Sequence, residues 1–536
     1  MIINLIKKRR RFSVRNCLRG YRQIKEKNKF ELIRAVKNQF PDYPIPEVKY
    51  LNSKSNFLSQ FTSIEPELVI KQFLIQFFTG QKFIRSFLLS EAMGTPMVVS
   101  LPKSWQNRLM ETGIKINSKA STFSWYVQVL MRLAYGHYIL LKLIFINTFK
   151  IENRYKNQQG HSYFVDLLPN NLPTGQIDSF DIFSWFNSMR KQNALSEKRF
   201  LHSVKPSGKK VFCDRFSIEY DVEPYYRIYS PRNKIIFILW SIRMSLIANS
   251  NLLFGRWWYA LLFSEIVKAK ATQLSPDFAS EYLFHYSVSI YRPLWSYVPE
   301  RNGSVIRCYF YSAVDQPKTP DNMDSQRYLW APVTWPEFLV WDLFQKKQLE
   351  QHICKGARVS ICGPTYFNDC SADIPPSNRP FLAVFNIDPH RQSSHFGIST
   401  LADYYSKNPK VRDQFLRDIV EIAAEMGFNV FIKPKRDIGN RMPKAYSALL
   451  RELSLHDHVT IVPSCISPFR LIKDSVATIS APFTSPTLFG GYLSIPSAYY
   501  DPSCWIDPRD GAARSAPILL GKKMLKSWLF KTIGSR

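Results

Sequence analysis

The sequence predicts an α/β protein of two domains, each built on a parallel sheet. Three observations lead to this prediction. Short apolar runs rich in Val, Ile and Phe recur between segments of helical periodicity. Strands that alternate with helices in this way form parallel sheets. A stretch rich in Pro and polar residues, 365–380, separates two such series and is the expected linker.

Composition places the chain among globular proteins that have an anionic partner. Hydrophobic residues make up 45% of the chain and aromatic residues 15%, which excludes a disordered protein. Lys and Arg number 72 against 42 Asp and Glu, for a formal net charge of +30. This charge favours nucleic acid, an acidic membrane surface or a phosphorylated substrate, and does not choose between them.

No metal or cofactor site is expected. The eight cysteines include no Cys-x-x-Cys pair, so they are interpreted as reduced thiols of a cytosolic protein. His456-x-His458 has no second ligand pair and is expected to be a solvated turn. The absence of Gly-x-Gly-x-x-Gly disfavours a nicotinamide enzyme.

Residues 1–40 form a basic segment that opens with Lys7-Lys8-Arg9-Arg10-Arg11. Apolar residues recur in it at loose helical spacing. A helix lying on an anionic membrane is the favoured interpretation, because each cation near the leaflet contributes about 1 kcal/mol. A solvated basic helix is the alternative.

Residues 41–364 are predicted to form the N-terminal domain, with helical insertions. A βαβ unit is expected at 97–116. Two long apolar stretches, 125–149 and 235–263, are interrupted by basic residues. A membrane span needs about 20 apolar residues, so we expect buried core helices and no transmembrane helix. Contact of either stretch with a bilayer is the alternative.

The remaining elements of this domain are strands and helices of ordinary length. Strands are predicted at 163–167, 306–312 and 357–362, and helices at 183–189 and 335–349. Asp166 lies at the end of the first of these strands.

Residues 381–520 are predicted to form the C-terminal domain, followed by a basic amphipathic helix over 521–536. Strands are expected at 381–385, 428–432, 459–462 and 476–480, and helices at 411–426 and 444–453. The last helix is expected to pack on the N-terminal domain or to contact lipid.

Two helices of the C-terminal domain are predicted to begin with Ser-Pro, at Ser467-Pro468 and Ser485-Pro486. Serine is a good N-cap, and Pro is well tolerated at the first helical position. A helix that begins after a parallel strand presents free N–H groups and a positive dipole end at the edge where ligands bind. Thr484, Ser485 and Thr487 are therefore predicted to bind a phosphate, Thr484 being a better candidate than the N-cap Ser485.

Lys433, Lys435 and Arg436 follow another strand of the same sheet and are predicted to bind the same phosphate. Fixed positive groups stabilise the charge that builds on a leaving phosphate. The alternative is that these cations solvate a loop.

The motif Ala481-Pro482-Phe483-Thr484-Ser485-Pro486, with Tyr499-Tyr500-Asp501-Pro502, resembles bacterial surface polysaccharide biosynthesis proteins that carry a PFTS motif. Residues 431–436, Arg292-Pro293-Leu294-Trp295 and 309–312 also resemble segments of that family. The resemblance implies a GT-B fold, in which two Rossmann-like domains face each other across a cleft. It also implies a glycosyltransferase that needs no metal and no cofactor.

Asp388, His390 and Arg391 follow the strand 381–385, so they are expected at the same edge of the sheet. A loop residue without a role is the alternative for each of them. Arg391 would bind phosphate, and His390 or Asp388 would deprotonate the acceptor hydroxyl, with Asp166 as an alternative base. Tyr499, Tyr500 and Asp501 would bind the nucleoside; a core tyrosine pair with a turn aspartate is the alternative.

The expected function is transfer of a sugar from a nucleotide-sugar to a lipid-linked or growing glycan during capsule or O-antigen synthesis. The expected location is the cytoplasm, with the inner face of the cytoplasmic membrane as an alternative. A non-catalytic assembly partner is the first rival. A basic nucleic-acid-binding protein is the second, and it is disfavoured because no nucleic-acid-binding module is recognised.

Overall fold

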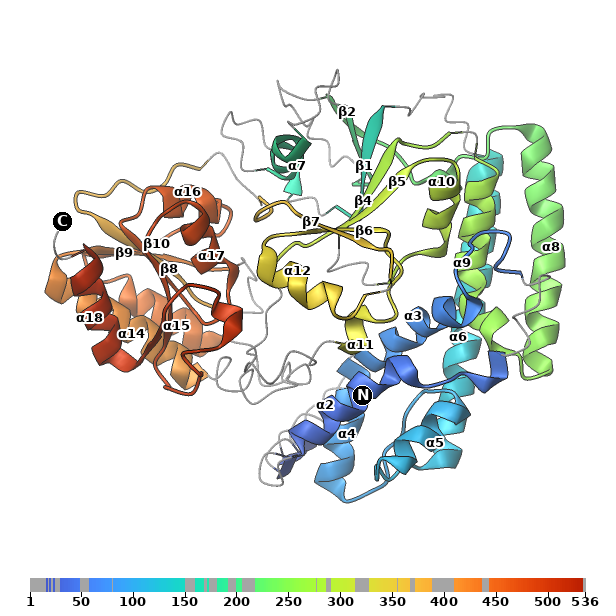
Figure 1. The fold of residues 1–536 in the computed structure, drawn as a ribbon, viewed down its shortest axis with the longest axis horizontal. Helices are drawn as coiled ribbons and strands as arrows, with labels where there is room; N and C mark the ends of the chain where they lie inside the picture. The colour runs from blue at the N-terminus through green and yellow to red at the C-terminus, as the bar shows by residue number, and fades with distance from the viewer. Residues whose placement is uncertain are drawn as a thin grey trace, which may run out of the picture.

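The structure is a computed structural model of the chain (Figure 1). It describes residues 16–17, 19–20, 23–24, 29–48, 57–79, 81–149, 160–167, 171–172, 181–190, 199–204, 217–275, 277–285, 291–313, 327–353, 355–366, 372–387, 409–435 and 443–533. Most of the predicted segment 1–40 and part of the predicted linker 365–380 lie outside these residues.

A sheet of seven parallel strands forms the centre of the N-terminal half. Its strands, in spatial order, are β3 (Ser217–Tyr220), β2 (Arg199–His202), β1 (His161–Val165), β4 (Glu281–His285), β5 (Val305–Tyr309), β6 (Glu337–Val340) and β7 (Arg358–Ile361). The chain begins at the centre, moves to one edge, and then returns to build the other side. This is the strand order of a doubly wound Rossmann sheet.

The C-terminal half repeats this order in a sheet of six parallel strands. The strands are β10 (Val459–Ile461), β9 (Asn429–Lys433), β8 (Phe381–Phe385), β11 (Ala477–Ser480), β12 (Ser497–Asp501) and β13 (Ile518–Leu520). Strands β8 and β9 are buried along their whole length, as strands covered by helices on both faces must be. The predicted fold class, two Rossmann-like α/β domains, is confirmed.

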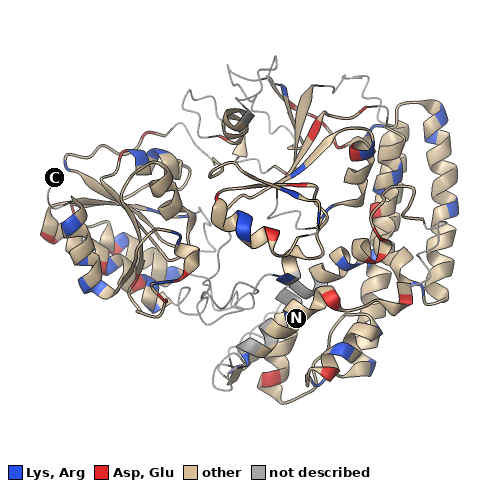
Figure 2. Ribbon diagram, viewed as in Figure 1, with Lys and Arg blue, Asp and Glu red and all other residues tan. Residues whose placement is uncertain are grey.

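Helices cover both sheets, and the N-terminal half carries additional ones (Figure 1). The N-terminal helices are α2 (Phe30–Gln39), α3 (Pro66–Thr79), α4 (Gln81–Met93), α5 (Lys103–Glu111), α6 (Ser118–Phe149), α7 (Ile182–Arg190), α8 (Pro231–Leu253), α9 (Trp257–Gln273), α10 (Tyr297–Arg301), α11 (Arg327–Trp330) and α12 (Leu343–Glu350). Short 3-10 turns are η1 (Phe40–Asp42), η4 (Pro224–Tyr226), η5 (Leu294–Ser296) and η9 (Gly511–Ala513). The C-terminal helices are α14 (Pro409–Met426), α15 (Lys444–Leu453), α16 (Pro468–Lys473), α17 (Ser485–Tyr492) and α18 (Gly521–Ile533). The Lys and Arg residues of the described part are distributed over both halves (Figure 2).

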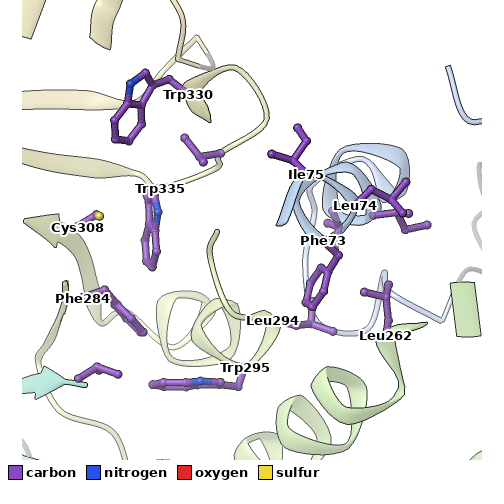
Figure 3. Packing of buried hydrophobic residues seen from close by; sticks show 14 of the residues in the cluster. Phe73, Leu74, Ile75, Leu262, Phe284, Leu294, Trp295, Cys308, Trp330 and Trp335 are labelled. Carbon is purple, nitrogen blue, oxygen red and sulfur yellow. The ribbon is translucent and has the colours of Figure 1, made fainter. Parts of the chain in front are cut away.

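The core of the N-terminal half joins the sheet to its helices through aromatic side chains (Figure 3). Phe284 of β4 lies between Trp295 and Trp335, with ring centroids 5.5 and 4.9 Å away. Helix α9 is buried on almost every side. Helix α6 approaches it closely at Gly136, where a Cβ atom would lie 2.5 Å from the Phe263 ring. A larger residue at this position would force the two helices apart.

The long apolar stretches differ from their predicted core burial. The chain breaks at Gly255, which has φ of 74°, so the stretch 235–263 is divided between α8 and α9. Only α9 is a core helix, whereas α6 and α8 each leave one apolar face exposed. By length and composition alone, α6 and α8 are also long and apolar enough to cross a membrane.

Two other elements differ from the predictions. Residues 335–349 were predicted as one helix, but they contain β6 and most of α12, because the buried run Glu337–Val340 pairs with β5 and β7. The predicted βαβ unit contains helix α5, but its two strands make a single parallel bridge, Met97 to Ile116. This bridge lies outside the named strands of the seven-stranded sheet.

Helix α18 packs on the C-terminal sheet. Leu525, Leu529 and Ile533 join the core of that sheet. On the rim of the contact, Lys522 and Lys526 form ion pairs with Glu421 and Glu425 of α14. The alternative that this helix packs on the N-terminal domain is therefore wrong.

Candidate functional site

In the C-terminal sheet, the order in which the chain adds strands reverses between β8 and β11. Ligands of doubly wound sheets bind at this switch point, beyond the carboxyl ends of the strands. Lys433, Phe385 and Ser480 are register partners on neighbouring strands, so their side chains lie on one face of the sheet. Helix α17, which the Thr484-Ser485 pair begins, follows β11 on that face, since Thr487 hydrogen-bonds with Ser480. The predicted phosphate-binding segments therefore lie along the same edge of one sheet.

The beginning of α17 differs by one residue from the prediction. Thr484 is the N-cap, Ser485 is the first helical residue and Pro486 follows it. The Thr484 hydroxyl donates to the Ala481 carbonyl at 2.6 Å and does not cap the helix. In α16, by contrast, the Ser467 hydroxyl accepts from the Phe469 N–H, as predicted. The first turn of α17 therefore lacks the side-chain cap that α16 has.

The backbone before α17 is held in an unusual conformation. Phe483 has φ of 57°, a left-handed value that costs a residue with a Cβ atom about 1–2 kcal/mol. Its ring packs near Tyr499, with ring centroids 5.7 Å apart. Strain of this kind persists where the surrounding structure enforces it, and it concentrates at binding sites. This conformation directs the chain into the start of α17.

The hydroxyl groups of the motif have different surroundings. Thr487 is buried, and its hydroxyl hydrogen-bonds with Ser480 and with the Ala498 carbonyl. It therefore fixes α17 to the sheet and does not face the space in front of the helix. Ser485 is half-buried and makes no hydrogen bond that the described residues show. Ser485, rather than Thr484 or Thr487, has the hydroxyl best placed for a ligand.

The predicted cations Lys433 and Lys435 differ in burial. Lys433 is buried, and its ammonium donates to the Ser464 carbonyl at 3.0 Å, in the loop before α16. Lys435 is exposed two residues beyond. Arg436 lies outside the described residues. Lys433 therefore holds the loop between β10 and α16, and it adds positive charge behind the edge of the sheet.

Sequence reasoning missed a further cation, Arg412, in the first turns of α14. It is 1% exposed and donates from Nη1 to the Asn386 side chain at 3.1 Å, directly after β8. Within the described part of the chain, its Nε and Nη2 atoms and the Asn386 amide nitrogen have no hydrogen-bond partner. Burial lowers the pKa of this guanidinium to about 10. Helical periodicity alone places position 412 on a buried face, which gives no indication of a ligand.

The residues predicted to bind the nucleoside are buried structural groups. Tyr500 donates its hydroxyl to the Asp418 carboxylate at 2.5 Å, and Tyr499 is 1% exposed. Asp501 accepts the N–H groups of Ser503 and Trp505, at 2.9 and 2.8 Å. Burial of this kind is what the alternative interpretation, a core tyrosine pair with a turn aspartate, expects, and nucleoside binding by these residues stays a prediction.

The predicted base and its neighbours, Asp388, His390 and Arg391, lie outside the described residues. The alternative base, Asp166, is exposed at the end of β1, with φ of 55°. Its strand is paired with β4, which ends at His285. Strands β1 and β4 flank the corresponding switch point of the N-terminal sheet, where its strand order reverses. Asp166 follows β1 as Asn386 follows β8, and His285 ends β4 at the position in its sheet where, in the C-terminal sheet, β11 leads to α17.

His285 has the features of a functional imidazole. It is 4% exposed, and neither ring nitrogen has a hydrogen-bond partner among the described residues. The hydroxyl of Tyr309, its register partner on β5, is likewise without one there. Burial lowers the pKa of His285 to about 4, so its imidazole is neutral at pH 7. A neutral imidazole at a strand end can accept a proton, although burial makes His285 a weaker base than an exposed histidine.

Other segments that carry the family resemblance stabilise the fold. Arg292 is buried and forms an ion pair with Glu300 at 2.5 Å. It also donates to the Thr334 carbonyl at 3.1 Å. No group of three or more His, Cys, Asp or Glu that could hold a metal occurs within the described residues.

Comparison with solved structures gives matches of low identity. One is a structure titled "Spinosyn Rhamnosyltransferase SpnG", with 13% identity, a TM-score of 0.33, and coverage of 70% of this chain and 90% of that one. Another is a UDP-GlcNAc 2-epimerase of Methanocaldococcus jannaschii in complex with UDP-GlcNAc and UDP, with 8% identity, a TM-score of 0.33, and 70% and 93% coverage. A third is the wall teichoic acid polymerase TagF, with 10% identity, a TM-score of 0.35, and 76% and 89% coverage.

Comparison with curated proteins gives no match. The family model described as "Polysaccharide biosynthesis PFTS motif protein" matches residues 240–529. This range is more than half of the 536 residues, and it runs from α8 through both the β8–β11 edge and α17. The chain therefore belongs to the polysaccharide biosynthesis PFTS motif proteins.

Proposed function

We propose that the protein is a glycosyltransferase of bacterial surface polysaccharide synthesis that uses a nucleotide-sugar donor. The observation that carries this proposal is the position of the PFTS motif. In a chain of a polysaccharide biosynthesis family, the motif forms the start of a helix at the switch point of a doubly wound sheet. Helix starts at such points bind phosphate groups, because their N–H groups and dipole favour negative charge.

The donor phosphates bind in front of α17. The N–H and hydroxyl groups of Ser485 donate to them, and Lys435 contributes a cation from the end of β9. Arg412 of α14 lies beside Asn386, which follows the neighbouring strand β8, and its two nitrogens without described partners favour a negatively charged group. Negative charge develops on the departing nucleotide during transfer, and these groups stabilise it without a metal.

The acceptor hydroxyl binds at the edge of the N-terminal sheet. His285 or Asp166 takes its proton as the sugar is transferred, since a hydroxyl needs a base to become a good nucleophile. The acceptor is a lipid-linked or growing glycan of capsule or O-antigen type. The protein works in the cytoplasm, at the inner face of the cytoplasmic membrane.

A thermal-shift screen tests this proposal. Purified full-length protein is heated with CMP-, UDP-, GDP- and dTDP-sugars, each at concentrations far above the expected Kd. A bound donor raises the unfolding temperature, because a ligand that binds only the folded state stabilises it by mass action. One nucleotide class should do this, and release of that nucleotide with a glycan acceptor should follow. No shift with any nucleotide would contradict the proposal.

A further inference from the structure

The helical layer of the N-terminal half carries exposed apolar side chains in two rows. On α6, six of them are spaced by three, four or eight residues, which places them on one side of the helix. They are Phe123, Val127, Leu130, Tyr138, Leu141 and Phe145. On α8, four are spaced by three or four residues: Ile235, Leu239, Ile242 and Leu246. We call these ten residues the apolar strip.

The two rows of the apolar strip lie on helices that are fixed side by side. His137 of α6 lies 3.4 Å from the Ser245 hydroxyl and 3.2 Å from the Asn249 side chain of α8. On their inner sides both helices pack on α9, and α8 lies at the outer edge of the molecule (Figure 1). The exposure is high for large apolar residues, 66% for Leu141 and 67% for Leu246. An exposed apolar surface of this extent indicates an interaction site.

The charges around the apolar strip have one sign. On the side of the apolar strip, α6 carries Lys119 and α8 carries Arg232 and Arg243, whereas Arg132 lies on the opposite side of α6 and Lys142 lies over the Tyr226 ring. Neither helix contains an Asp or Glu residue. In Figure 2, α8 shows basic positions and no acidic ones. The partner of this surface must therefore be apolar at its centre and negatively charged around it.

We propose that the apolar strip docks on the surface of a bilayer that contains anionic lipids. Apolar helix faces flanked by Lys and Arg lie in the membrane interface, buried by about 5–10 Å, while each cation interacts with lipid head groups. A second copy of the chain is a poor occupant, because two such surfaces would bring like charges together. The helices do not cross the bilayer, because their inner faces pack on the core helix α9 and basic residues interrupt both sequences.

This inference concerns a surface that the sequence analysis did not favour. The sequence favours membrane contact for residues 1–40, leaves it open for residues 521–536, and gives it only as the alternative to core burial for the two long apolar stretches. In the structure, Lys522 and Lys526 of the C-terminal helix are paired with glutamates of α14. The inference does not depend on the proposed sugar transfer, since it concerns binding alone.

Vesicle flotation with the full-length protein tests the inference. The vesicles contain either phosphatidylcholine alone or equal parts of phosphatidylcholine and phosphatidylglycerol. The test variant combines Leu141→Glu with Leu246→Glu. Two control variants alter exposed apolar residues of the C-terminal half: Leu455→Glu, where Leu455 is 83% exposed, and Phe530→Glu on α18, where Phe530 is 67% exposed. Circular dichroism and thermal unfolding establish that each variant is folded.

The wild type should float with anionic vesicles and much less with neutral ones. The double variant should bind anionic vesicles at least about tenfold more weakly, because it removes two exposed leucines that the bilayer would bury and adds two negative charges. Both controls should bind like the wild type. Arg243→Glu, which leaves the apolar strip intact, should weaken binding to anionic vesicles by roughly tenfold. Alkaline carbonate should release the bound protein.

Several results would overturn the inference. These are unchanged binding by the folded double variant, equal binding to neutral vesicles, and loss of binding in Phe530→Glu alone. Resistance to carbonate would show that helices cross the bilayer and do not lie on it. A dimer in solution that the double variant converts to monomer would assign the surface to a second copy.

Discussion

Trp341, at the end of β6 in the N-terminal sheet, packs against Phe489 of α17, with ring centroids 5.2 Å apart. The helix that begins at the end of the PFTS motif is thus held by both halves of the molecule. Phe469 of α16 stacks on the same Phe489 ring, with ring centroids 4.3 Å apart. A second link lies nearby, where Arg514 of the C-terminal half forms an ion pair with Asp342 at 2.8 Å. Any ligand at α17 is therefore bound next to the junction of the two halves.

Replacing this tryptophan should uncouple the two halves. Trp341→Ala removes a buried indole and should cost about 3–5 kcal/mol, as large-to-small changes at aromatic core residues do. Because one hydrophobic core spans both halves, the wild type should unfold in one calorimetric transition and the variant in two. Trp295→Ala is the matched control, since Trp295 packs only within the N-terminal half. Trp295→Ala should lower the transition temperature while leaving a single transition. Two transitions in both variants would contradict the prediction.

Two serine substitutions should separate capping from ligand binding. Ser467→Ala removes the cap of α16 and should destabilise the protein by about 1 kcal/mol, with nucleotide affinity unchanged. Ser485→Ala removes a hydroxyl that caps nothing, so it should leave stability nearly unchanged and weaken nucleotide binding by about tenfold. Urea unfolding and calorimetric titration measure the two quantities. The reverse pattern would show that Ser485 is a structural residue.

The tyrosine pair should behave as core. Tyr500→Phe leaves the buried Asp418 carboxylate without its 2.5 Å hydrogen bond, which should cost about 1.5–3 kcal/mol. The KM for the nucleotide-sugar should not change, because the hydroxyl faces α14 and not the ligand edge of the sheet. Steady-state kinetics and urea unfolding check both statements. A raised KM with unchanged stability would restore the nucleoside-binding role.

Buried histidines should make stability depend on pH. Burial lowers the pKa of His285 and of His202 to about 4, from an ordinary value of 6.5. Between pH 6.5 and pH 4 the unfolded chain binds more protons than the folded one, so stability falls as the pH falls through this window. At pH 5 each histidine should lower the free energy of unfolding by about 2 kcal/mol relative to pH 7.5.

His285→Leu isolates one of these two contributions. Urea unfolding of the wild type and the variant at pH 7.5 and pH 5 should show a smaller loss of stability in the variant, by about 2 kcal/mol. An equal loss in both proteins would mean that His285 is protonated in the folded protein at pH 5.

The C-terminal half could be predicted closely because its signals are local. The strand at 381–385 and the helix Lys444–Leu453 coincide with β8 and α15, and the Ser467 cap is where Ser-Pro places it. Short buried strands flanked by Gly, Pro or Ser are read well from a single sequence. The predicted start of α17 was wrong by one residue, because Thr484 and Ser485 have the same capping chemistry and only the backbone distinguishes them.

The site and the helical layer depend on tertiary structure, which local patterns do not contain. Arg412 and His285 lie on elements distant in the sequence from the motif, and their importance follows from burial without described partners. From the sequence, the outer faces of α6 and α8 cannot be distinguished from buried faces, because each helix has apolar residues on all its sides. Only the packing of α9 shows which of those residues the fold covers.

The central claim is that a nucleoside diphosphate binds in front of α17, and calorimetric titration of the wild type and Ser485→Asp tests it most directly. The nucleotide selected by the thermal-shift screen should bind the wild type with one site per chain. Because the aspartate places a negative charge where the phosphate binds, the folded variant should bind at least about tenfold more weakly. Equal affinity of both proteins, or no binding to the folded wild type, would contradict the claim.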